Sequence, residues 1–326
     1  MGLPATSNDV QARLPSTRLG LSRVGVTGVE KVIRISSGES EQLFFAELEC
    51  FVDLNADQKG AHMSRFEEIV GEAIDEVVLR QAFRAETLAA HIADLVRDRQ
   101  DGLRAEVRIT ARYPEQQIAP VSGKPTQGIY TMLGAAVASD KGTRRVVGVE
   151  AQGMTACPCA QEMVAERARA RLTGEGFTDD EIVRVIASVP IATHNQRGLG
   201  TLHVGATEEY EEPIEAGTLL EIVEHSMSSE IYELLKRGDE VEVVEKAHRR
   251  PRFVEDCVRE MLSATIERFG GLGDGAFVSA RQRNLETIHR HDVVAERHGT
   301  LGALRSELAG GAAAGPDITM REWLEG

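Results

Sequence analysis

The chain has 326 residues, of which 42% are hydrophobic and 27% are charged, and its formal net charge is −15. This length suits two domains of ordinary size, and the composition is that of a soluble globular protein. The negative charge argues against a nucleic acid as partner, because a phosphate backbone requires a basic surface, and no apolar run is long enough to cross a membrane. A small anionic substrate needs only a local cluster of basic side chains.

The ends of the chain differ from its middle. Residues 1–18 are polar, contain two prolines and lack the apolar core of a signal peptide, and residues 301–326 include a run of glycine and alanine. Both patterns predict flexible segments outside the folded core. The chain has four cysteines, too few for a disulfide framework at this length, so we expect a reducing, cytoplasmic environment.

The first half of the chain, residues 19–142, carries strand and helix signals in the order ββααββ. Apolar, β-branched or alternating patterns mark four strands: residues 29–35, 43–54, 105–113 and 129–137. Ser64 followed by Glu67 has the pattern of a capping box and predicts a helix that begins at Ser64. A second helix is predicted over residues 88–96 by the spacing of its apolar residues.

The second half, residues 143–300, repeats this order with one insertion. Strand patterns occur at four positions: residues 146–155, 200–206, 276–283 and 292–297. Helical spacing occurs at four positions: residues 162–172, 180–186, 220–234 and 254–265. The first two of these helices lie in the insertion, residues 160–188, and Gly270 with Gly271 predicts a C-cap for the last.

Antiparallel strands that carry a pair of helices on one face form an α+β unit, so the repeat predicts two tandem ββααββ modules. A small sheet of this kind has exposed edge strands, whose unpaired backbone groups are satisfied when another subunit pairs with them. We therefore expect a homo-oligomer.

Thiolate, imidazole and carboxylate groups, which bind divalent transition metals, occur in short motifs far apart in the chain. They belong to five residues: Cys157, Cys159, His194, Glu286 and His289. Two cysteines one residue apart cannot easily bond to each other, because their side chains diverge, so one sulfur is better placed on a metal. The spacing is not that of a structural zinc site, and the cysteines could equally be small core residues and His289 a surface residue.

The other candidates also have ordinary structural interpretations. Glu240 belongs to a charged segment, where a solvated helix end is the usual role. Glu255 lies in the first turn of a predicted helix, where a carboxylate interacts favourably with the helix dipole. His194 could be a solvated loop histidine. Glu286 and His289 can meet at one ion only if the backbone turns between them, and their region could equally be a polar hairpin.

Six motifs occur in a fixed order along the chain: Gly60-Ala61-His62-Met63-Ser64-Arg65-Phe66, Cys157-Pro158-Cys159, His194-Asn195-Gln196-Arg197-Gly198, Glu230-Ile231-Tyr232 with Lys236-Arg237-Gly238-Asp239-Glu240, Arg252-Phe253-Val254-Glu255-Asp256, and Glu286-Thr287-Ile288-His289. Together they resemble the type IB GTP cyclohydrolases, which include bacterial enzymes of the folate pathway and archaeal enzymes that begin methanopterin synthesis. The resemblance runs from about Leu21 to His298, and the insertion at 160–188 is similar to that of the archaeal branch. Bacterial members commonly read Arg-Pro-Asp-Glu where this chain has Gly238 in place of the proline.

The resemblance implies the tunnelling fold (T-fold), with two ββααββ modules per chain in an oligomeric barrel that we expect to be a homotetramer. It also implies hydrolysis of GTP at C8 of guanine with release of formate. The product is a 7,8-dihydroneopterin phosphate, either the triphosphate or the 2′,3′-cyclic phosphate, in the first step of tetrahydrofolate or methanopterin synthesis. The implied cofactor is one divalent transition metal per subunit, with Fe(II) preferred and Zn(II) or Mn(II) as alternatives.

The resemblance further implies roles for single residues. Five are implied around the metal: Cys157 as its thiolate ligand, Glu240, Glu286, His289, and His194 as a ligand or a proton shuttle. Which of them bind together stays open, because a catalytic site keeps one position for water. Cys157, His194 and Glu286 are the implied catalytic residues, and Cys159 is expected only to tune or protect Cys157.

Substrate contacts follow from the same resemblance. Glu255 is similar to the carboxylate that holds the purine by accepting hydrogen bonds from the guanine N1–H and 2-amino group, which requires an ionised, bidentate carboxylate. The implied contacts to the triphosphate are Arg197, Lys236, Arg237, and His62 and Arg65 from a neighbouring subunit.

Two other functions compete with this one. Another tunnelling-fold enzyme, such as a cysteine-dependent, NADPH-requiring nitrile reductase acting on a deazaguanine, would use a cysteine as a covalent nucleophile and need no metal. A non-catalytic purine-binding or scaffold protein could keep the fold without the chemistry. The presence of Cys157, His194, Glu286 and His289 argues against the second alternative.

Overall fold

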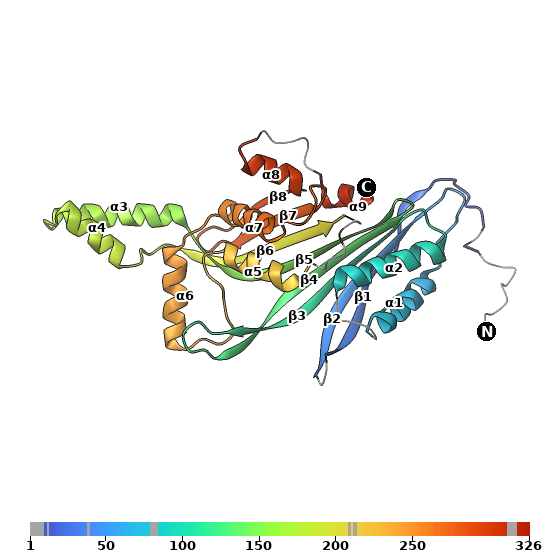
Figure 1. Cartoon of the computed structure of the whole chain (residues 1–326), viewed down its shortest axis with the longest axis horizontal. Coiled ribbons are helices and arrows are strands. Elements are labelled where there is room, and N and C mark those ends of the chain that lie inside the picture. The colour runs from blue at the N-terminus through green and yellow to red at the C-terminus, as the bar shows by residue number, and fades with distance from the viewer. Residues whose placement is uncertain are drawn as a thin grey trace.

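The computed structural model of the chain describes residues 10–11, 13–37, 40–78, 84–207, 210, 214–311 and 318–326. In these ranges eight strands form one antiparallel sheet, in which every strand pairs with its neighbours along the sequence. The strands are β1 (Leu21–Ser37), β2 (Ser40–Leu54), β3 (Ala105–Ile118), β4 (Pro125–Ser139), β5 (Gly142–Ala156), β6 (Asn195–Ala206), β7 (Phe277–Leu285) and β8 (Val293–Thr300). Figure 1 shows the sheet as a long, twisted layer through most of the molecule.

Nine helices accompany the sheet in the described ranges: α1 (Met63–Val78), α2 (Ala85–Gln100), α3 (Pro158–Gly174), α4 (Asp179–Ser188), α5 (Ala216–Ser226), α6 (Arg237–Arg249), α7 (Val254–Arg268), α8 (Leu301–Leu308) and α9 (Met320–Glu325). α1, α2, α5 and α7 pack against the sheet, whereas α3 and α4 project away from it (Figure 1). None of the helices in these ranges is both long and apolar enough to cross a membrane. The architecture is α+β, as the sequence predicts.

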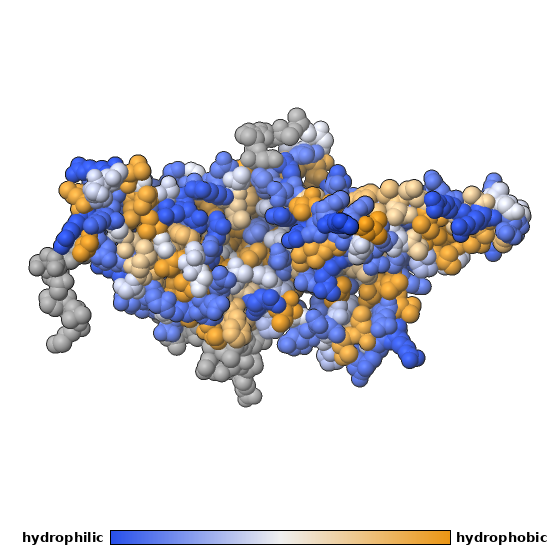
Figure 2. Space-filling view, turned by 180° about the vertical axis from the view of Figure 1, so that it is seen from behind, coloured by the Kyte–Doolittle hydropathy of each residue, from blue (hydrophilic) through white to orange (hydrophobic). Residues whose placement is uncertain are grey.

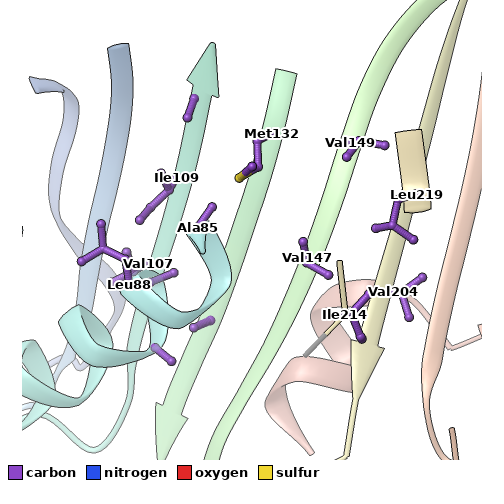
Figure 3. Packing of buried hydrophobic residues seen from close by; sticks show 14 of the residues in the cluster. Ala85, Leu88, Val107, Ile109, Met132, Val147, Val149, Val204, Ile214 and Leu219 are labelled. Atoms are coloured by element: carbon purple, nitrogen blue, oxygen red, sulfur yellow. The ribbon is translucent and has the colours of Figure 1, made fainter. Parts of the chain in front are cut away.

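Alternation along β3 explains how the sheet buries one of its faces. Val107 and Ile109 are at most 1% exposed, while Arg108 and Thr110 lie on the other face and are exposed. Leu88 of α2 packs on the buried side, and Figure 3 shows it beside Val107 and Ile109. Burying one side chain of this size stabilises a fold by roughly 1.5–3 kcal/mol. The apolar faces of α2 and β3 therefore fix this helix on the sheet.

At one end the sheet divides into two arms, a feature that we call the fork. β4 and β5 pair only as far as Thr131 and Glu150. Beyond this point β4 stays paired with β3 as far as Pro125, and β5 stays paired with β6 as far as Ala156. The β3–β4 arm and the β5–β6 arm therefore separate, and α6 spans the open end between them (Figure 1).

Residues 227–236 cross the fork from one arm to the other. Ser229 forms an isolated β-bridge with Met154 of β5. Further along, the Leu234 N–H donates to Thr126 Oγ1 of β4 at 3.2 Å. The first part of the fourth motif, Glu230-Ile231-Tyr232, lies in this segment and therefore connects the two arms.

The strands lie where the sequence predicts them, but several helix ends differ. The helix predicted over 220–234 ends at Ser226, because the following segment leaves the helix to cross the fork. α1 begins at Met63, so Ser64 lies inside the helix and is not its N-cap. α7 ends with Phe269 as its C-cap, one residue before the predicted glycine pair.

The prediction of a flexible tail over residues 301–326 is wrong for the two helices described there. α8 buries Leu301 and Leu304. α9 buries Trp323, which is 2% exposed and packs on Phe277 with 5.8 Å between the ring centroids. Apolar side chains at helical spacing therefore hold this part of the chain on the sheet. The expected flexible residues 1–9, 12 and 312–317 lie outside the described residues.

α9 covers the face of the sheet opposite to α2. Gly134 of β4 faces α2, where an added Cβ would lie 2.4 Å from the Ala85 carbonyl carbon. Val137, three residues further along β4, packs with Trp323 of α9. Successive strand residues point to opposite faces, so the two helices lie on different sides. The Trp323 indole N–H also donates to the Gly275 carbonyl at 2.8 Å, which fixes the orientation of its ring.

We expect Trp323→Ala to lower the free energy of unfolding by about 3–5 kcal/mol, because it leaves a cavity between α9 and the sheet. Denaturant unfolding followed by circular dichroism would measure the change. Leu308→Ala is the matched control, because Leu308 of α8 is 63% exposed and its loss should cost about 0.5 kcal/mol or less. Equally small effects of the two substitutions would contradict the role of Trp323 in holding α9.

Candidate active site

Three strand ends bring predicted site residues to one edge of the sheet. Cys157 follows the last residue of β5, His194 precedes the first residue of β6, and Glu286 follows the last residue of β7. β6 lies between β5 and β7 and pairs with both near its first residues. Antiparallel pairing therefore places these three residues at the same edge, although 129 positions separate the first from the last (286 − 157).

The insertion does not separate Cys157 from His194, because its two ends are hydrogen-bonded to each other. The Cys157 N–H donates to the His194 carbonyl at 3.1 Å, and Thr193 Oγ1 donates to the Cys157 carbonyl at 2.7 Å. α3 and α4 therefore form a hairpin that leaves and re-enters at one point. Apolar side chains are exposed on this hairpin (Figure 2), among them those of Phe177 and Val183.

His194 and Glu286 are side-chain neighbours. Their Nδ1 and Oε2 atoms are 3.8 Å apart, and the side chains are 15% and 7% exposed, respectively. Glu286 Oε2 is buried and has no hydrogen-bond partner in the described part of the chain. A buried carboxylate oxygen without a donor is costly, so this atom is suited to a cation or a proton donor that completes the site.

The two cysteines differ in their surroundings. Cys157 is half-buried at the N-cap of α3, where its Sγ accepts from the Ala160 N–H at 3.5 Å. Cys159 is exposed in the first turn of α3. Both thiols are free. The backbone N–H and C=O of Cys157 are both hydrogen-bonded to residues beside the sheet edge. Cys157 is therefore the better placed of the two cysteines to hold a ligand in one position.

The structure does not bring all five predicted metal residues together. Glu240 is exposed on α6, and His289 is exposed and stacks on His291 with 5.2 Å between ring centroids. Within the described ranges, no group of three or more His, Cys, Asp or Glu side chains is arranged to hold a metal ion. The reason is geometric: His289 lies in the turn beyond β7, and Glu240 lies on the helix across the fork.

Glu255 lies near the same edge of the sheet. The Arg252 N–H donates to the Ala156 carbonyl at 2.9 Å, which places the start of α7 next to Cys157. Glu255, in the first turn of α7, is exposed and lines a pocket of about 440 Å³ between α7, β8 and α8. The Glu255 carboxylate is therefore open to a ligand. Glu255 also lies in the first helical turn, where the ordinary structural interpretation places it.

The basic residues predicted to contact a triphosphate lie in three places. Arg197 is exposed on β6, three residues after His194, and Lys236 and Arg237 begin α6 across the fork. His62 and Arg65 lie at the start of α1, toward the opposite end of the molecule from α3 (Figure 1). One chain therefore does not gather these residues around one site.

Arg197 lines a polar pocket of about 540 Å³ in the fork. Glu224 of α5 lines the same pocket, and burial, with the charges of Glu230 and Glu115, raises its pKa to about 7. Gln117 Nε2 donates to Glu224 Oε1 at 2.9 Å. Glu224 carries no functional signal in the sequence, because a glutamate on an amphipathic helix is ordinary until the fork buries it.

Asp239, the neighbour of the predicted ligand Glu240, is the carboxylate that the fold buries at this point. Its Oδ1 accepts from the Val121 and Ser122 N–H groups, each at 2.8 Å, and its Oδ2 accepts from Ser122 Oγ at 2.8 Å. The Lys236 N–H also donates to Oδ2 at 2.8 Å, which closes the first turn of α6. Asp239 therefore ties α6 to the turn between β3 and β4.

The other end of α6 is tied to the second arm. Gln161 Nε2 of α3 donates to the His248 carbonyl at 2.6 Å and to the Ile191 carbonyl at 3.0 Å. α6 therefore connects the two arms of the fork. Its start is bonded to the β3–β4 turn, and its end is bonded to the base of the α3–α4 hairpin.

Residues 8–295 match the profile of the family described as "Type I GTP cyclohydrolase folE2". The chain therefore belongs to the type I GTP cyclohydrolase family, as the six motifs predict. Its relatives include GTP cyclohydrolase MptA of Methanococcus aeolicus, which is 41% identical over 308 residues that cover 92% of this chain and 99% of that protein. GTP cyclohydrolase MptA of Methanocaldococcus jannaschii is 40% identical over 306 residues, or 92% of this chain and 97% of that one.

A solved structure with a similar fold is uricase from Arthrobacter globiformis. Its TM-score is 0.51 at 10% identity, with 86% of this chain and 94% of that chain covered. At this identity the similarity concerns the fold alone.

We expect Asp239→Asn to lower Tm by several degrees at neutral pH, because an amide cannot accept all four hydrogen bonds. Burial opposes ionisation of Asp239, but these hydrogen bonds outweigh it and hold its pKa well below its usual range. A carboxylate with a lowered folded-state pKa stabilises the fold fully above its unfolded pKa of about 3.9 and loses this effect as the pH falls. The difference in Tm between wild type and variant should therefore shrink below about pH 4.

Asp256→Asn provides the control for this experiment. Asp256 accepts from the Phe253 N–H at 3.0 Å and caps α7 in the same way, but it does not connect the two arms. Its replacement should lower Tm less. Equal losses for the two variants would mean that Asp239 is only a helix cap.

Proposed function

We propose that this chain is a metal-dependent GTP cyclohydrolase of type IB, which hydrolyses GTP at C8 of guanine, releases formate and yields a 7,8-dihydroneopterin phosphate. Family membership over residues 8–295 supports this activity. The observation that carries the proposal is the meeting of His194 and Glu286 at the sheet edge where Cys157 begins α3. The product is the triphosphate or the 2′,3′-cyclic phosphate, and the reaction begins tetrahydrofolate or methanopterin synthesis.

The donor types at the sheet edge suit a divalent transition metal, although in the described chain their side chains are not arranged around one point. The donor set of thiol, imidazole and carboxylate suits Fe(II), Zn(II) and Mn(II), and the unpartnered Glu286 Oε2 has the buried lone pairs that a cation would neutralise. Cys157 and Glu286 would hold the ion, and His194 would be a further ligand or a proton shuttle beside it. His289 and Glu240 would complete the surroundings of the ion if the turn beyond β7 and α6 approach. When bound, the metal supplies a water molecule that ionises near neutral pH.

The protein's own groups would move the protons. Loss of C8 as formate consumes two water molecules, because both formate oxygens come from water, and it breaks the bonds from C8 to N7 and N9. N9 gains one proton, and N7, which is doubly bonded to C8 in GTP, gains two. His194 and Glu286 lie close enough to each other to pass protons between water and these nitrogens. The low exposure of both side chains keeps bulk water from competing with this transfer.

Different residues would contact the guanine and the triphosphate of GTP. Glu255, at the open start of α7, would accept hydrogen bonds from N1–H and the 2-amino group of guanine. Arg197, Lys236 and Arg237 would contact the triphosphate from the two sides of the fork. His62 and Arg65 would reach the site only from a neighbouring subunit, because α1 lies toward the opposite end of its own chain (Figure 1).

This arrangement favours a homo-oligomer built from tandem modules. Each half of the chain contributes four strands and a helix pair to the sheet, in the order expected of two ββααββ modules. The outer strands β1 and β8 each pair on one side only in the described chain. Pairing of these edges between subunits would close an oligomeric barrel, and we propose a tetramer.

Removal of the metal should abolish GTP turnover, and Fe(II), Zn(II) or Mn(II) should restore it, because the bound ion would supply a water molecule that ionises near neutral pH. Cys157→Ala should remove both bound metal and activity. Cys159→Ala is the matched control and should keep some bound metal, because the Cys159 thiol is exposed. Metal content and formate release would be measured on the same samples. Full turnover after chelation would favour a cysteine-dependent reaction instead.

Glu255→Gln should turn over GTP very poorly while its Tm and metal content stay near those of the wild type. A glutamine offers one acceptor and directs an amine at a donor, so the loss of a charge-assisted pair should cost about 2–4 kcal/mol, or a tens- to thousand-fold drop in kcat/KM. A helix-start acid contributes only about 0.3–1 kcal/mol to stability. Glu267→Gln, at an exposed position later on α7, is the control and should leave kcat/KM unchanged. Normal kinetics of Glu255→Gln would assign the purine to another residue.

A further inference from the structure

We propose that Gln196 is a positioning residue that fixes the tautomer of His194, with the proton on Nδ1 and the lone pair on Nε2. The inference rests on the proposed function, because it concerns the form in which His194 would act there. It deepens that function by saying which ring nitrogen faces the chemistry and which residue decides it.

The contacts of Gln196 form a short chain of hydrogen bonds. Gln196 is the second residue of β6 and is 5% exposed. Its Oε1 lies 3.0 Å from His194 Nδ1, and its Nε2 donates to Thr155 Oγ1 at 3.1 Å. Thr155 is fully buried and pairs with Gln196 across β5 and β6. The strand register therefore sets the position of the whole chain of bonds.

The direction of this chain decides the tautomer. A glutamine side chain has one acceptor oxygen and one donor nitrogen, so an amine that faces Thr155 leaves the carbonyl oxygen facing His194. A carbonyl oxygen only accepts, and Nδ1 must therefore carry the proton. Glu286 Oε2 lies 3.8 Å from the same Nδ1 and, when ionised, is also an acceptor. Both neighbours favour a protonated Nδ1 and leave the lone pair on Nε2.

The face of β6 that carries Gln196 is buried and closely packed. Gly198 follows on the same face of β6, and a Cβ there would lie 2.4 Å from Gln282 Nε2, which shows how closely this layer is packed. Gln282 Nε2 donates to Asn284 Oδ1 at 3.1 Å, and both side chains are at most 2% exposed. Gln196 is therefore a buried amide on the same face of β6 as this closely packed region, and its two hydrogen-bond partners are His194 and Thr155.

The consequence is a defined role for His194. A neutral imidazole with its lone pair on Nε2 can bind a metal or accept a proton through that atom only. Partners that orient a ligating or basic histidine in this way typically change affinity or activity by about 10–100-fold when they are removed. Without Gln196 the ring could take the other tautomer and present N–H where a lone pair is needed.

Long-range ¹H–¹⁵N spectra of metal-free protein labelled at histidine would report the tautomer directly, with the His194 signals assigned from His194→Gln. We expect the wild type to have the proton on Nδ1. Gln196→Glu keeps an acceptor at Nδ1 and should keep this tautomer. Gln196→Met, which is similar in size but has no acceptor, should shift the population toward Nε2–H and lower kcat about 10–100-fold with a smaller change in KM.

Two further variants provide a second test of the tautomer and a negative control. Thr155→Val removes the acceptor that orients the amide and should shift the tautomer partly, even if Gln196→Met folds poorly. Gln116→Met, at an exposed position on β3, should change neither the tautomer nor kcat. A wild-type proton on Nε2, or an unchanged tautomer in both Gln196→Met and Thr155→Val, would overturn the inference. If the tautomers behave as expected but no protein releases formate from GTP, the proposed function fails and the inference about Gln196 stands.

Discussion

The pairing of β6 with β5 on one side and β7 on the other is the constraint on which the candidate site depends. It brings the end of β5, the start of β6 and the end of β7 to one edge, and so places Cys157, His194 and Glu286 together. The same register sets Thr155 opposite Gln196, which orients His194. A shift of one residue would turn each of these side chains to the other face. The geometry of the candidate site therefore depends on the register, and hydrogen bonds at the base of the α3–α4 hairpin keep Cys157 beside His194.

The fork gives a structural role to a motif whose other residues are proposed to contact the metal and the substrate. Residues 230–240 cross between the arms and include the start of α6. Asp239 accepts four hydrogen bonds there, which attach α6 to the turn between β3 and β4. The neighbouring Glu240 stays exposed. Within one motif, one carboxylate thus stabilises the fold and the other remains available to a ligand. The fork also creates the polar pocket that contains Arg197 and Glu224, whose shifted pKa follows from burial between the arms.

The distribution of the remaining site residues suggests how the protein would complete its site. Glu255 and Arg197 lie on the same part of the molecule as His194, whereas His62 and Arg65 lie toward the other end. Two open sheet edges and a long, two-part sheet are the features through which a second copy could bring these residues together. The proposed contacts of His62 and Arg65 with the substrate therefore require the proposed assembly.

The sequence alone determined the α+β class, the strands, the helical insertion and the family, because alternation and helical spacing are local patterns and the six motifs stand in a fixed order. It also selected Cys157, His194 and Glu286, because few residue types bind metals. Only the tertiary structure decided that α5 ends at Ser226, that Trp323 is buried, and that Asp239 and Glu224 are enclosed. Each of these depends on the separation of the arms or on contacts between segments distant in sequence. A pattern within one segment carries no information on which other segment covers it. The proposed positioning role of Gln196 therefore depends on the register of β5, β6 and β7 and cannot be read from the sequence.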